Sequence, residues 1–422
     1  LKENPVTADA APAESASAPL LPESLEYTRR LIAFPSIAQT SNLDIIDYIE
    51  AEFARHGHTG HRSYSEDGTR ANLFITIPAA DGTVNGGIII SGHTDVVPVE
   101  GQIWDSDPFT VRIEGTRAYG RGVCDMKGYL GAALWLLPRI RQDRLRVPLH
   151  FAFTYDEEVG CVGAPALIEE FTHRGVHPQF CVVGEPTSMR VISAHKGAHR
   201  GRVSITGVAK HASLATHGVS AVNAAGEFIT FVARLADSCE QEGPFDQAFV
   251  VPHATGGVNF ARGGVQYNIV AERAVLEYDF RILPSMTTES VVQRLEDELF
   301  GAILPRMHAR AARAEELSGA EPGSLTAQVQ VQHELLAAVP GLGTPDDAEL
   351  VRLANTLLGL TEAPQKVTYG TEAGLFQRAG VESIVCGPGD IAQAHSPNEW
   401  VELEQLRDCE RFFEAILGWA SQ

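Results

Sequence analysis

The segment IIISGHTDVVP, residues 88–98, constrains the fold of this chain more than any other. Its three consecutive isoleucines are apolar and β-branched, which is typical of a strand buried on both faces of a sheet. His93 and Asp95 follow two residues apart, so an extended backbone would project both side chains to the same side. In open α/β sheets the carboxyl ends of the strands hold the functional site. The pair is therefore a candidate site, and a buried histidine beside a capping aspartate is the structural alternative.

The composition is that of a globular protein large enough for two domains. The 422 residues are 44% hydrophobic and 21% charged, which suffices for a substantial core. Lys and Arg number 33 against 54 Asp and Glu, a formal net charge of -21. This excess of negative charge argues against nucleic acid or an anionic membrane as the main partner. No apolar run is long enough to span a bilayer.

The six cysteines are scattered along the chain and include no CxxC pair. Four of them lie inside apolar segments, where a free cysteine behaves as a small buried hydrophobic residue. This pattern predicts free, mostly buried thiols in a reducing compartment, and we therefore expect a cytoplasmic location.

The order of predicted elements indicates one domain interrupted by another. Residues 1–20 are rich in Ala, Pro, Ser and Glu, which predicts a disordered tail. Residues 21–194 alternate strands with helices, which predicts an α/β domain with a largely parallel, doubly wound sheet. Residues 195–338 have the order strand-helix-strand-strand-helix-strand of a ferredoxin-like α+β module, and we also expect a strand at 265–270. Residues 339–422 then resume the first domain.

Four further segments with acidic or histidine residues follow predicted strands of the first domain. They are YGRGVCDMKG with Asp125, DEEVG with Glu157 and Glu158, GEPTS with Glu185, and AHSPNEW with His395. Each alone has an ordinary explanation as a helix cap, an exposed charge or a turn. Together they form a set of imidazole and carboxylate groups that is typical of divalent-metal sites. So many acidic groups at one edge of a sheet also need cations to offset their repulsion.

These motifs, in this order, resemble those of metallopeptidase family 20, the two-zinc aminoacylase and carboxypeptidase group. The resemblance spans about residues 22–420. Within the family, the segments AHKG, DFRILP, TYGTEAG and GPGDIAQAH are most similar to those of enzymes that deacetylate N-acetylornithine in arginine biosynthesis. The resemblance implies a zinc-peptidase-like catalytic domain with an inserted lid, through which the protein would form a homodimer.

By this resemblance, five residues would hold two divalent metal ions, with zinc expected and cobalt or manganese as alternatives. Asp125 would bridge the two ions. His93 and Glu185 would complete one metal site, and Glu158 and His395 would complete the other.

The resemblance also implies catalytic and substrate-binding residues. Glu157 would be the general base toward a water shared by the ions, and Asp95 would orient and polarise the neighbouring histidine ligand. In the inserted domain, His211 would reach an active site, often that of the partner subunit. Arg281 would bind the substrate carboxylate, a task that suits a guanidinium group, and Asn268 is a further candidate for that pocket.

The expected reaction is hydrolysis of the acyl-amide bond of a small N-acyl amino acid, with N-acetylornithine as the first expected substrate. A succinyl-diaminopimelate desuccinylase, an N-acetylcitrulline deacetylase or a small carboxypeptidase would share all the metal residues, so the motifs do not separate these activities. A relative that binds metal or peptide without turnover is another alternative. The intact Glu157 and the complete ligand set argue against it.

Overall fold

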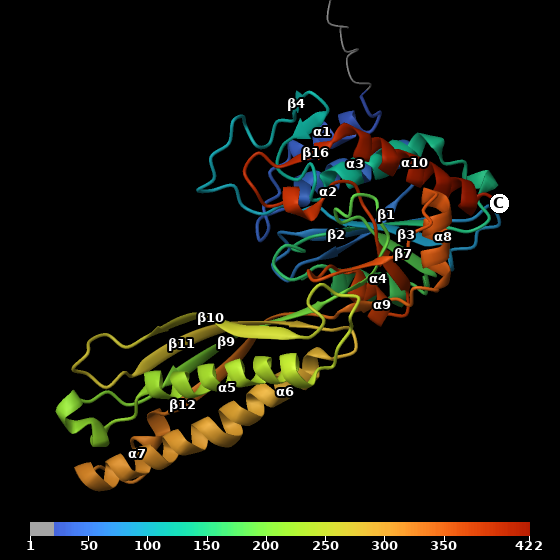
Figure 1. The fold of residues 1–422 in the computed structure, drawn as a ribbon. Helices are drawn as coiled ribbons and strands as arrows, with labels where there is room; N and C mark the ends of the chain where they lie inside the picture. Colours follow the sequence, from blue (N-terminus) through green and yellow to red (C-terminus); the bar gives the residue numbers. More distant parts are fainter. Residues whose placement is uncertain (1–20) are drawn as a thin grey trace, which may run out of the picture.

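The computed structural model describes residues 21–422, which form two lobes (Figure 1). The predicted tail, residues 1–20, lies outside the described residues. The larger lobe contains the segments on either side of the smaller one, which therefore interrupts it in sequence.

A nine-stranded sheet forms the centre of the larger lobe. Its strands are β1 (Gly60–Tyr64), β2 (Ala71–Ile77), β3 (Ile88–His93), β6 (Leu149–Thr154), β7 (Phe180–Val183), β8 (Ile192–His195), β13 (Leu342–Gly343), β14 (Gln365–Val367) and β15 (Glu382–Val385). They are ordered β1-β2-β6-β3-β7-β15-β8-β13, and β14 pairs with β8. The central strands β6, β3, β7 and β15 are parallel, whereas β1 and β2 are antiparallel additions at one side. The predicted largely parallel sheet is confirmed.

Helices cover both faces of this sheet (Figure 1). One layer contains α1 (Leu25–Ile32), α2 (Leu43–Arg55), α3 (Lys127–Leu136), α8 (Glu349–Leu358) and α10 (Leu403–Ala420), and the other contains α4 (Ala164–His173) and α9 (Ala373–Arg378). Ile88 and Ile90 of β3 pack in the first layer's core, and Ile89 packs in the second. The three isoleucines are buried because successive side chains of a strand point to opposite faces. The chain is therefore doubly wound, as predicted.

A small antiparallel sheet brings two distant segments of the larger lobe together. Its strands are β4 (Arg112–Glu114), β5 (Arg117–Tyr119) and β16 (Trp400–Glu402), in the order β16-β5-β4. Because β5 precedes the loop with Asp125 and β16 follows the loop with His395, this pairing holds the two loops near each other.

The smaller lobe is a four-stranded antiparallel sheet with helices on one face (Figure 1). It contains β9 (Gly197–Thr206), α5 (Ala221–Glu242), β10 (Thr255–Gly263), β11 (Arg273–Ile282), α6 (Thr288–Glu298), α7 (Leu304–Ser318) and β12 (Gln330–Val339). The helices and the inner face of the sheet enclose a separate core. The predicted strand-helix-strand-strand-helix-strand order is confirmed.

The prediction of a strand at 265–270 is wrong. This segment is the loop between β10 and β11, where Val265 is 81% and Tyr267 96% exposed. Its apolar and β-branched residues favoured a strand, but β10 ends before this segment, at Gly263. Ile269 forms only an isolated bridge with His211.

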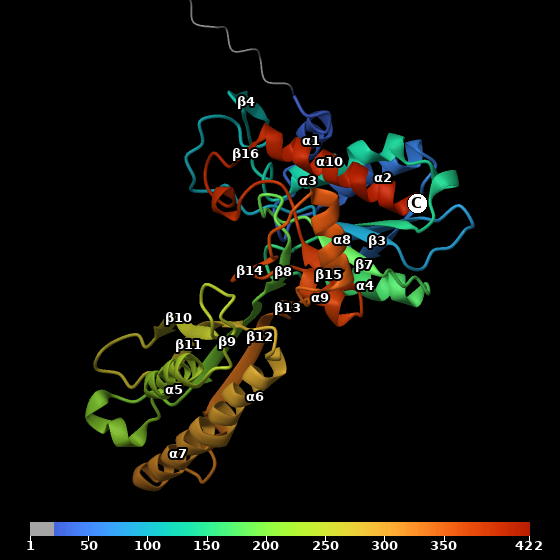
Figure 2. The ribbon, with the colours of Figure 1, turned by 45° about the vertical axis from the view of Figure 1, so that its right-hand side comes forward.

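Two neighbouring segments connect the lobes (Figure 2). One joins β8 to β9 and the other joins β12 to β13. The segments remain paired on both sides of the junction, because Ala198 lies opposite Val339 and His195 lies opposite Leu342. The sheet of the smaller lobe, which we call the lid, is thus attached to the central sheet through two adjacent connecting segments.

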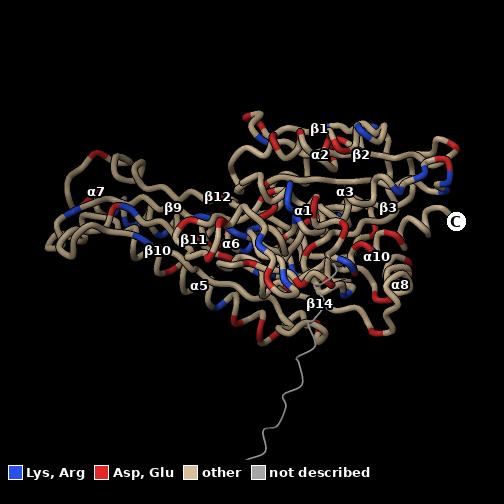
Figure 3. Tube along the Cα trace, turned by 90° about the horizontal axis from the view of Figure 1, so that it is seen from above, with Lys and Arg blue, Asp and Glu red and all other residues tan. Residues whose placement is uncertain are grey.

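Acidic and basic residues are interspersed over both lobes (Figure 3). Among residues 21–422, no helix is long and apolar enough to cross a membrane. All six cysteines are free and buried, as predicted from their apolar surroundings.

Candidate active site

Seven of the residues predicted from the motifs lie together where the parallel strands end. His93 closes β3, and Glu185 follows β7. The other five are Asp95 after β3, Asp125 before α3, Glu157 and Glu158 after β6, and His395 in the loop between β15 and β16. This is the edge at which an open α/β sheet places its ligands.

Asp125 lies between the two histidines. Its Oδ1 is 2.9 Å from Nε2 of His93, and its Oδ2 is 3.2 Å from Nε2 of His395. The second histidine also lies 3.0 Å from Oε2 of Glu158. Each oxygen of Asp125 thus faces a different imidazole, which is the arrangement expected of a carboxylate that bridges two cations.

Asp95 contacts both halves of the site. Its backbone oxygen accepts a hydrogen bond from Nδ1 of His93 at 2.9 Å, and its carboxylate lies 3.6 Å from the same nitrogen. The two carboxylate oxygens accept hydrogen bonds from the backbone N–H groups of Glu157 and Glu158, each at 3.2 Å. The ring is therefore oriented by the backbone of Asp95, while the carboxylate positions the turn that follows β6.

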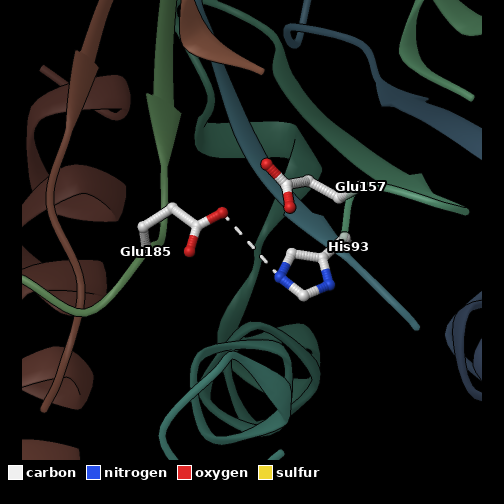
Figure 4. Close-up of side chains that lie close together, drawn as sticks. All are labelled: His93, Glu157 and Glu185. Carbon is white, nitrogen blue, oxygen red and sulfur yellow. Dashed lines mark ion pairs between the residues drawn. The ribbon is translucent and has the colours of Figure 1, made fainter. Parts of the chain in front are cut away.

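Glu157 and Glu185 point toward His93 from neighbouring strands (Figure 4). Oε1 of Glu185 lies 3.8 Å from Nε2 of the imidazole. Burial, opposed by the His93 charge and reinforced by the Glu158 and Asp125 carboxylates, raises the pKa of Glu157 to about 8. Burial, together with Asp125 and Glu157, raises the pKa of Glu185 well above its usual range. Without cations these carboxylates would therefore favour the protonated form.

The donor set fits divalent metal ions. Nδ1 of His93 is directed at the backbone oxygen of Asp95, and Nε2 lies 2.9 Å from Oδ1 of Asp125 and 3.8 Å from Oε1 of Glu185. In the neutral form of the ring this Nε2 would therefore be the ligand atom for a cation lying among these oxygens. Oε1 of Glu185 is buried without a hydrogen-bond partner in the described part of the chain. Two groups have ligand atoms within 4.8 Å of one another, namely His93 with Glu157 and Glu185, and His93 with Asp125 and Glu158. Imidazole nitrogens mixed with carboxylate oxygens suit zinc and related ions.

A buried ion pair that the sequence motifs did not reveal holds the loops of Asp125 and His395. Arg121 and Glu399 are each 1% exposed, and Nη1 donates to Oε2 at 2.7 Å. Oε1 of Glu399 accepts hydrogen bonds from the backbone N–H of Asp125 at 3.1 Å and of its neighbour Cys124 at 2.9 Å. Glu399 lies within the His395 motif, so its acidic character there was the available signal.

A glutamine extends this network to the second histidine. Nη2 of Arg121 donates to Oε1 of Gln102 at 2.6 Å, and Nε2 of Gln102 donates to the backbone oxygen of His395 at 3.0 Å. A continuous set of hydrogen bonds therefore connects the backbone of Asp125 with that of His395.

Glu372 lies beneath the site and does not line the cavity above it. It is buried, and its two oxygens accept hydrogen bonds from the hydroxyl of Ser91 at 2.6 Å and that of Thr154 at 2.8 Å. Ser91 lies on β3 and Thr154 on β6, so this carboxylate ties together the ends of the two strands that position His93 and Glu157.

The lid contributes one of its three predicted residues to the cavity above the site. This cavity has a volume of about 290 Å³ and lies between the lobes. Its charged lining consists of Asp125, Glu157, Glu158, Glu185 and His395 from the larger lobe and Arg200 and Arg281 from the lid. His211 and Asn268 do not line it. They lie in adjacent loops of the lid, where the backbone oxygen of Asn268 accepts a hydrogen bond from Ala212.

The chain matches a known protein family. The family model described as peptidase family M20/M25/M40 matches residues 89–418. The chain belongs to the M20/M25/M40 peptidase family. The resemblance found in the sequence motifs is confirmed, and so is the α/β fold with an inserted domain.

Curated relatives of this M20/M25/M40 member include two named acetylornithine deacetylase. One, from Proteus mirabilis (strain HI4320), is 33% identical over 390 residues, which cover 91% of this chain and 93% of the relative. Another, from Shigella sonnei (strain Ss046), is 33% identical over 393 residues, which cover 92% and 95% of the two chains. The protein is therefore a metallo-amidohydrolase that acts on linear amides.

Solved structures of the same family share the fold. An M20 family metallo-carboxypeptidase from Sulfolobus solfataricus superposes with a TM-score of 0.69 at 18% identity, covering 95% of this chain and 100% of the other. A dinuclear metal-binding peptidase of the M20 family from Bacillus subtilis superposes with a TM-score of 0.57 at 15% identity, covering 93% and 96%.

We expect Glu399→Gln to lower the stability of the protein by about 3–5 kcal/mol, because it leaves the buried Arg121 charge without its partner. Thermal unfolding of the purified variant measures this loss. The double variant Arg121→Gln/Glu399→Gln should recover part of it, since both buried charges are then removed. The control is Glu402→Gln, which breaks the more exposed pair with Arg117 and should change the melting temperature little. An unchanged melting temperature in Glu399→Gln would contradict this prediction.

Proposed function

We propose that the protein binds two divalent metal ions, zinc in its working form, and hydrolyses the acyl-amide bond of N-acyl amino acids. The observation that carries this proposal is Asp125, whose two oxygens face two different imidazoles at 2.9 Å and 3.2 Å. One ion would be held by Asp125, His93 and Glu185. The other would be held by Asp125, Glu158 and His395.

The metal pair, when bound, would acidify a water molecule and polarise the scissile carbonyl group. The remaining chemistry falls to the side chains of the chain. Asp125, Glu158 and Glu185 would compensate the positive charge of the ions. The backbone oxygen of Asp95 holds His93 in the tautomer whose Nε2 is free to act as a ligand.

Glu157 is the general base in this proposal. It takes a proton from the attacking water, which forms the new C–O bond at the carbonyl carbon, and delivers that proton to the amide nitrogen as the C–N bond breaks. The products are a carboxylic acid and a free amino acid. The Glu157 carboxylate is half-buried and lies beside the ligand cluster, that is His93, Asp125, Glu158, Glu185 and His395, where a water held by the ions would be within its reach.

N-acetylornithine is the first candidate substrate, and its hydrolysis would supply ornithine for arginine biosynthesis. The support is the name of the relatives that are 33% identical over more than nine tenths of the chain. Arg281 lines the cavity opposite the ligand cluster and would bind the substrate carboxylate. A cavity of about 290 Å³ suits a small substrate of this kind.

We also propose that the lid forms a homodimer, through which His211 reaches the active site of the partner subunit and Asn268 lies near it. His211 is exposed, and its Nδ1 accepts a hydrogen bond from the backbone N–H of Ser213. The neutral ring therefore carries its proton on Nε2, from which it can donate to a substrate oxygen. A hollow of about 850 Å³ adjoins this loop, and exposed apolar residues, Val265 and Tyr267, lie beside it.

Replacing Glu157 with Gln should lower kcat at least about 100-fold, because the amide keeps the shape of the side chain but cannot accept the water's proton. Metal content, measured by elemental analysis, should match that of the unsubstituted protein. Full turnover in this variant would remove Glu157 from the role of general base.

Removal of metal by a chelator should abolish hydrolysis of N-acetylornithine, and zinc, cobalt or manganese should restore it. The assay measures released amino acid, and N-succinyl-diaminopimelate and N-acetylcitrulline are tested beside N-acetylornithine. We expect N-acetylornithine to have the highest kcat/KM. Faster hydrolysis of either alternative would replace the proposed substrate while leaving the reaction unchanged.

Mixing inactive His211→Ala subunits with inactive Glu157→Gln subunits should restore about a quarter of full activity, because half the dimers are mixed and each mixed dimer has one complete site. Light scattering measures the dimer, and exchange between tagged subunits verifies mixing. Verified mixed dimers without any activity would contradict the delivery of His211 to the partner's site.

A further inference from the structure

Two arginines of the lid are held side by side by one carboxylate. Asp279 and Arg281 lie on β11, and Arg200 lies directly opposite Asp279 on β9. Nε of Arg200 donates to Oδ2 of Asp279, and Nε of Arg281 donates to Oδ1, each at 2.9 Å. Tyr278 and Phe280 alternate with Asp279 and Arg281 along β11 and are buried in the lid core. Asp279, Arg281 and the opposing Arg200 therefore share the other face of the sheet.

The Nη groups of both guanidinium groups remain available for a ligand. Among the described residues, the hydrogen bonds of Arg200 and Arg281 are those of Nε with Asp279. Both side chains line the cavity above the ligand cluster. Binding through Nε fixes each planar group while leaving its two terminal amino groups for a second carboxylate.

Arg202, on the same strand, is an arginine whose hydrogen bonds all go to neighbouring residues of the lid sheet. It lies two residues beyond Arg200 and faces the same side, opposite Glu277. Its Nε and Nη2 both donate to Glu277, and its Nη1 donates to Glu334 at 3.2 Å. Arg202 does not line the cavity. Both terminal amino groups of Arg202 are therefore bonded to acidic neighbours, whereas Arg200 is bonded to Asp279 through Nε alone.

The charges of this group match one carboxylate. Arg200 and Arg281 contribute two positive charges and Asp279 removes one, which leaves a net charge of one. Across the cavity lie the carboxylates of the ligand cluster, so the two walls differ in sign. A substrate whose amide lies at the cluster, and whose carboxylate on the carbon next to the amide nitrogen faces the lid, complements both walls.

We propose that Arg200 is a second carboxylate-binding residue, which grips the single carboxylate of the substrate together with Arg281, while Asp279 positions both. This inference rests on the proposed hydrolysis of N-acyl amino acids and deepens it. It assigns to the site a preference for substrates with one carboxylate on the lid side.

The test compares Arg200→Gln with the control Arg202→Gln in the zinc-loaded, full-length protein. Arg200→Gln should raise KM for N-acetylornithine about 10- to 100-fold with kcat nearly unchanged, because it removes hydrogen bonds made equally in the ground and transition states. Arg202→Gln should leave both constants unchanged. Arg200→Lys, which keeps the charge but not the planar fork, should give an intermediate KM.

Calorimetric binding separates this inference from the proposed reaction. In the Glu157→Gln background, Arg200→Gln should weaken binding of N-acetylornithine by the same factor. It should not change binding of N-acetyl-1,4-diaminobutane, the same molecule without its carboxylate. Suppose that Arg200→Gln weakens binding in calorimetry but the unsubstituted protein does not hydrolyse the substrate. The proposed carboxylate binding by Arg200 and Arg281 would then stand, and the proposed reaction would be rejected.

A double-mutant cycle distinguishes direct contact from positioning. If Arg200 touches the carboxylate, Arg200→Gln should still weaken binding when Arg281 is already replaced by Gln. No further loss in that background would make Arg200 only a support for Arg281 and overturn the proposal. Equal affinities for Arg200→Gln and Arg202→Gln, or binding of neither compound by any of these proteins, would overturn it as well.

Discussion

The site depends on placing four carboxylates and the buried His93 close together at one edge of the sheet, with the half-exposed His395 beside them. Asp125 shares hydrogen-bond contacts with His93 and His395, and Glu185 keeps an unpaired buried oxygen beside them. Burial and like charge both disfavour ionised carboxylates, so cations lying among these side chains would stabilise the charged form. The parallel sheet makes this crowding feasible because β6, β3 and β7 end at one edge, and each delivers its side chain without a detour of the backbone.

Hydrogen bonds from the surrounding structure hold the backbone of the clustered acidic residues in place despite their mutual repulsion. Glu399 accepts hydrogen bonds from the backbone of Asp125 while paired with Arg121, and Asp95 accepts them from the turn after β6. Glu372 ties β3 to β6 through two hydroxyl groups. These buried carboxylates accept hydrogen bonds from backbone, hydroxyl or guanidinium donors, whereas Asp125, Glu158 and Glu185 face the imidazole nitrogens of the candidate metal site. The supports can therefore remain satisfied whether or not ions are bound, which keeps the ligands in place for them.

The division into two lobes separates charge across the cavity. The larger lobe supplies the acidic wall and the lid supplies Arg200 and Arg281. Both arginines lie close to the junction, where the paired segments of β9 and β12 lead into β8 and β13. Movement of the lid would thus change the distance between the guanidinium groups and the ligand cluster. The proposed chemistry and the proposed carboxylate recognition consequently both depend on how these two neighbouring segments place the lid over the larger lobe.

Local patterns in the sequence predicted the elements and the acidic and histidine residues at the strand ends, and the family resemblance suggested which of these would be metal ligands. The bounds of α2, β2 and β6 follow from hydrophobic periodicity, which depends only on neighbouring residues. Short motifs at the strand ends likewise identified the candidate ligands, which are His93, Asp125, Glu158, Glu185 and His395. Only the tertiary structure decided that Glu399 pairs with Arg121, 278 residues away, and that residues 265–270 lie beyond the end of the sheet. It alone also separated Arg200 from Arg202, since the segment RGR presents two equivalent arginines. One of them has its terminal amino groups bonded to acidic neighbours, and the other lines the cavity. This difference depends on how distant strands pair and on where the second lobe lies.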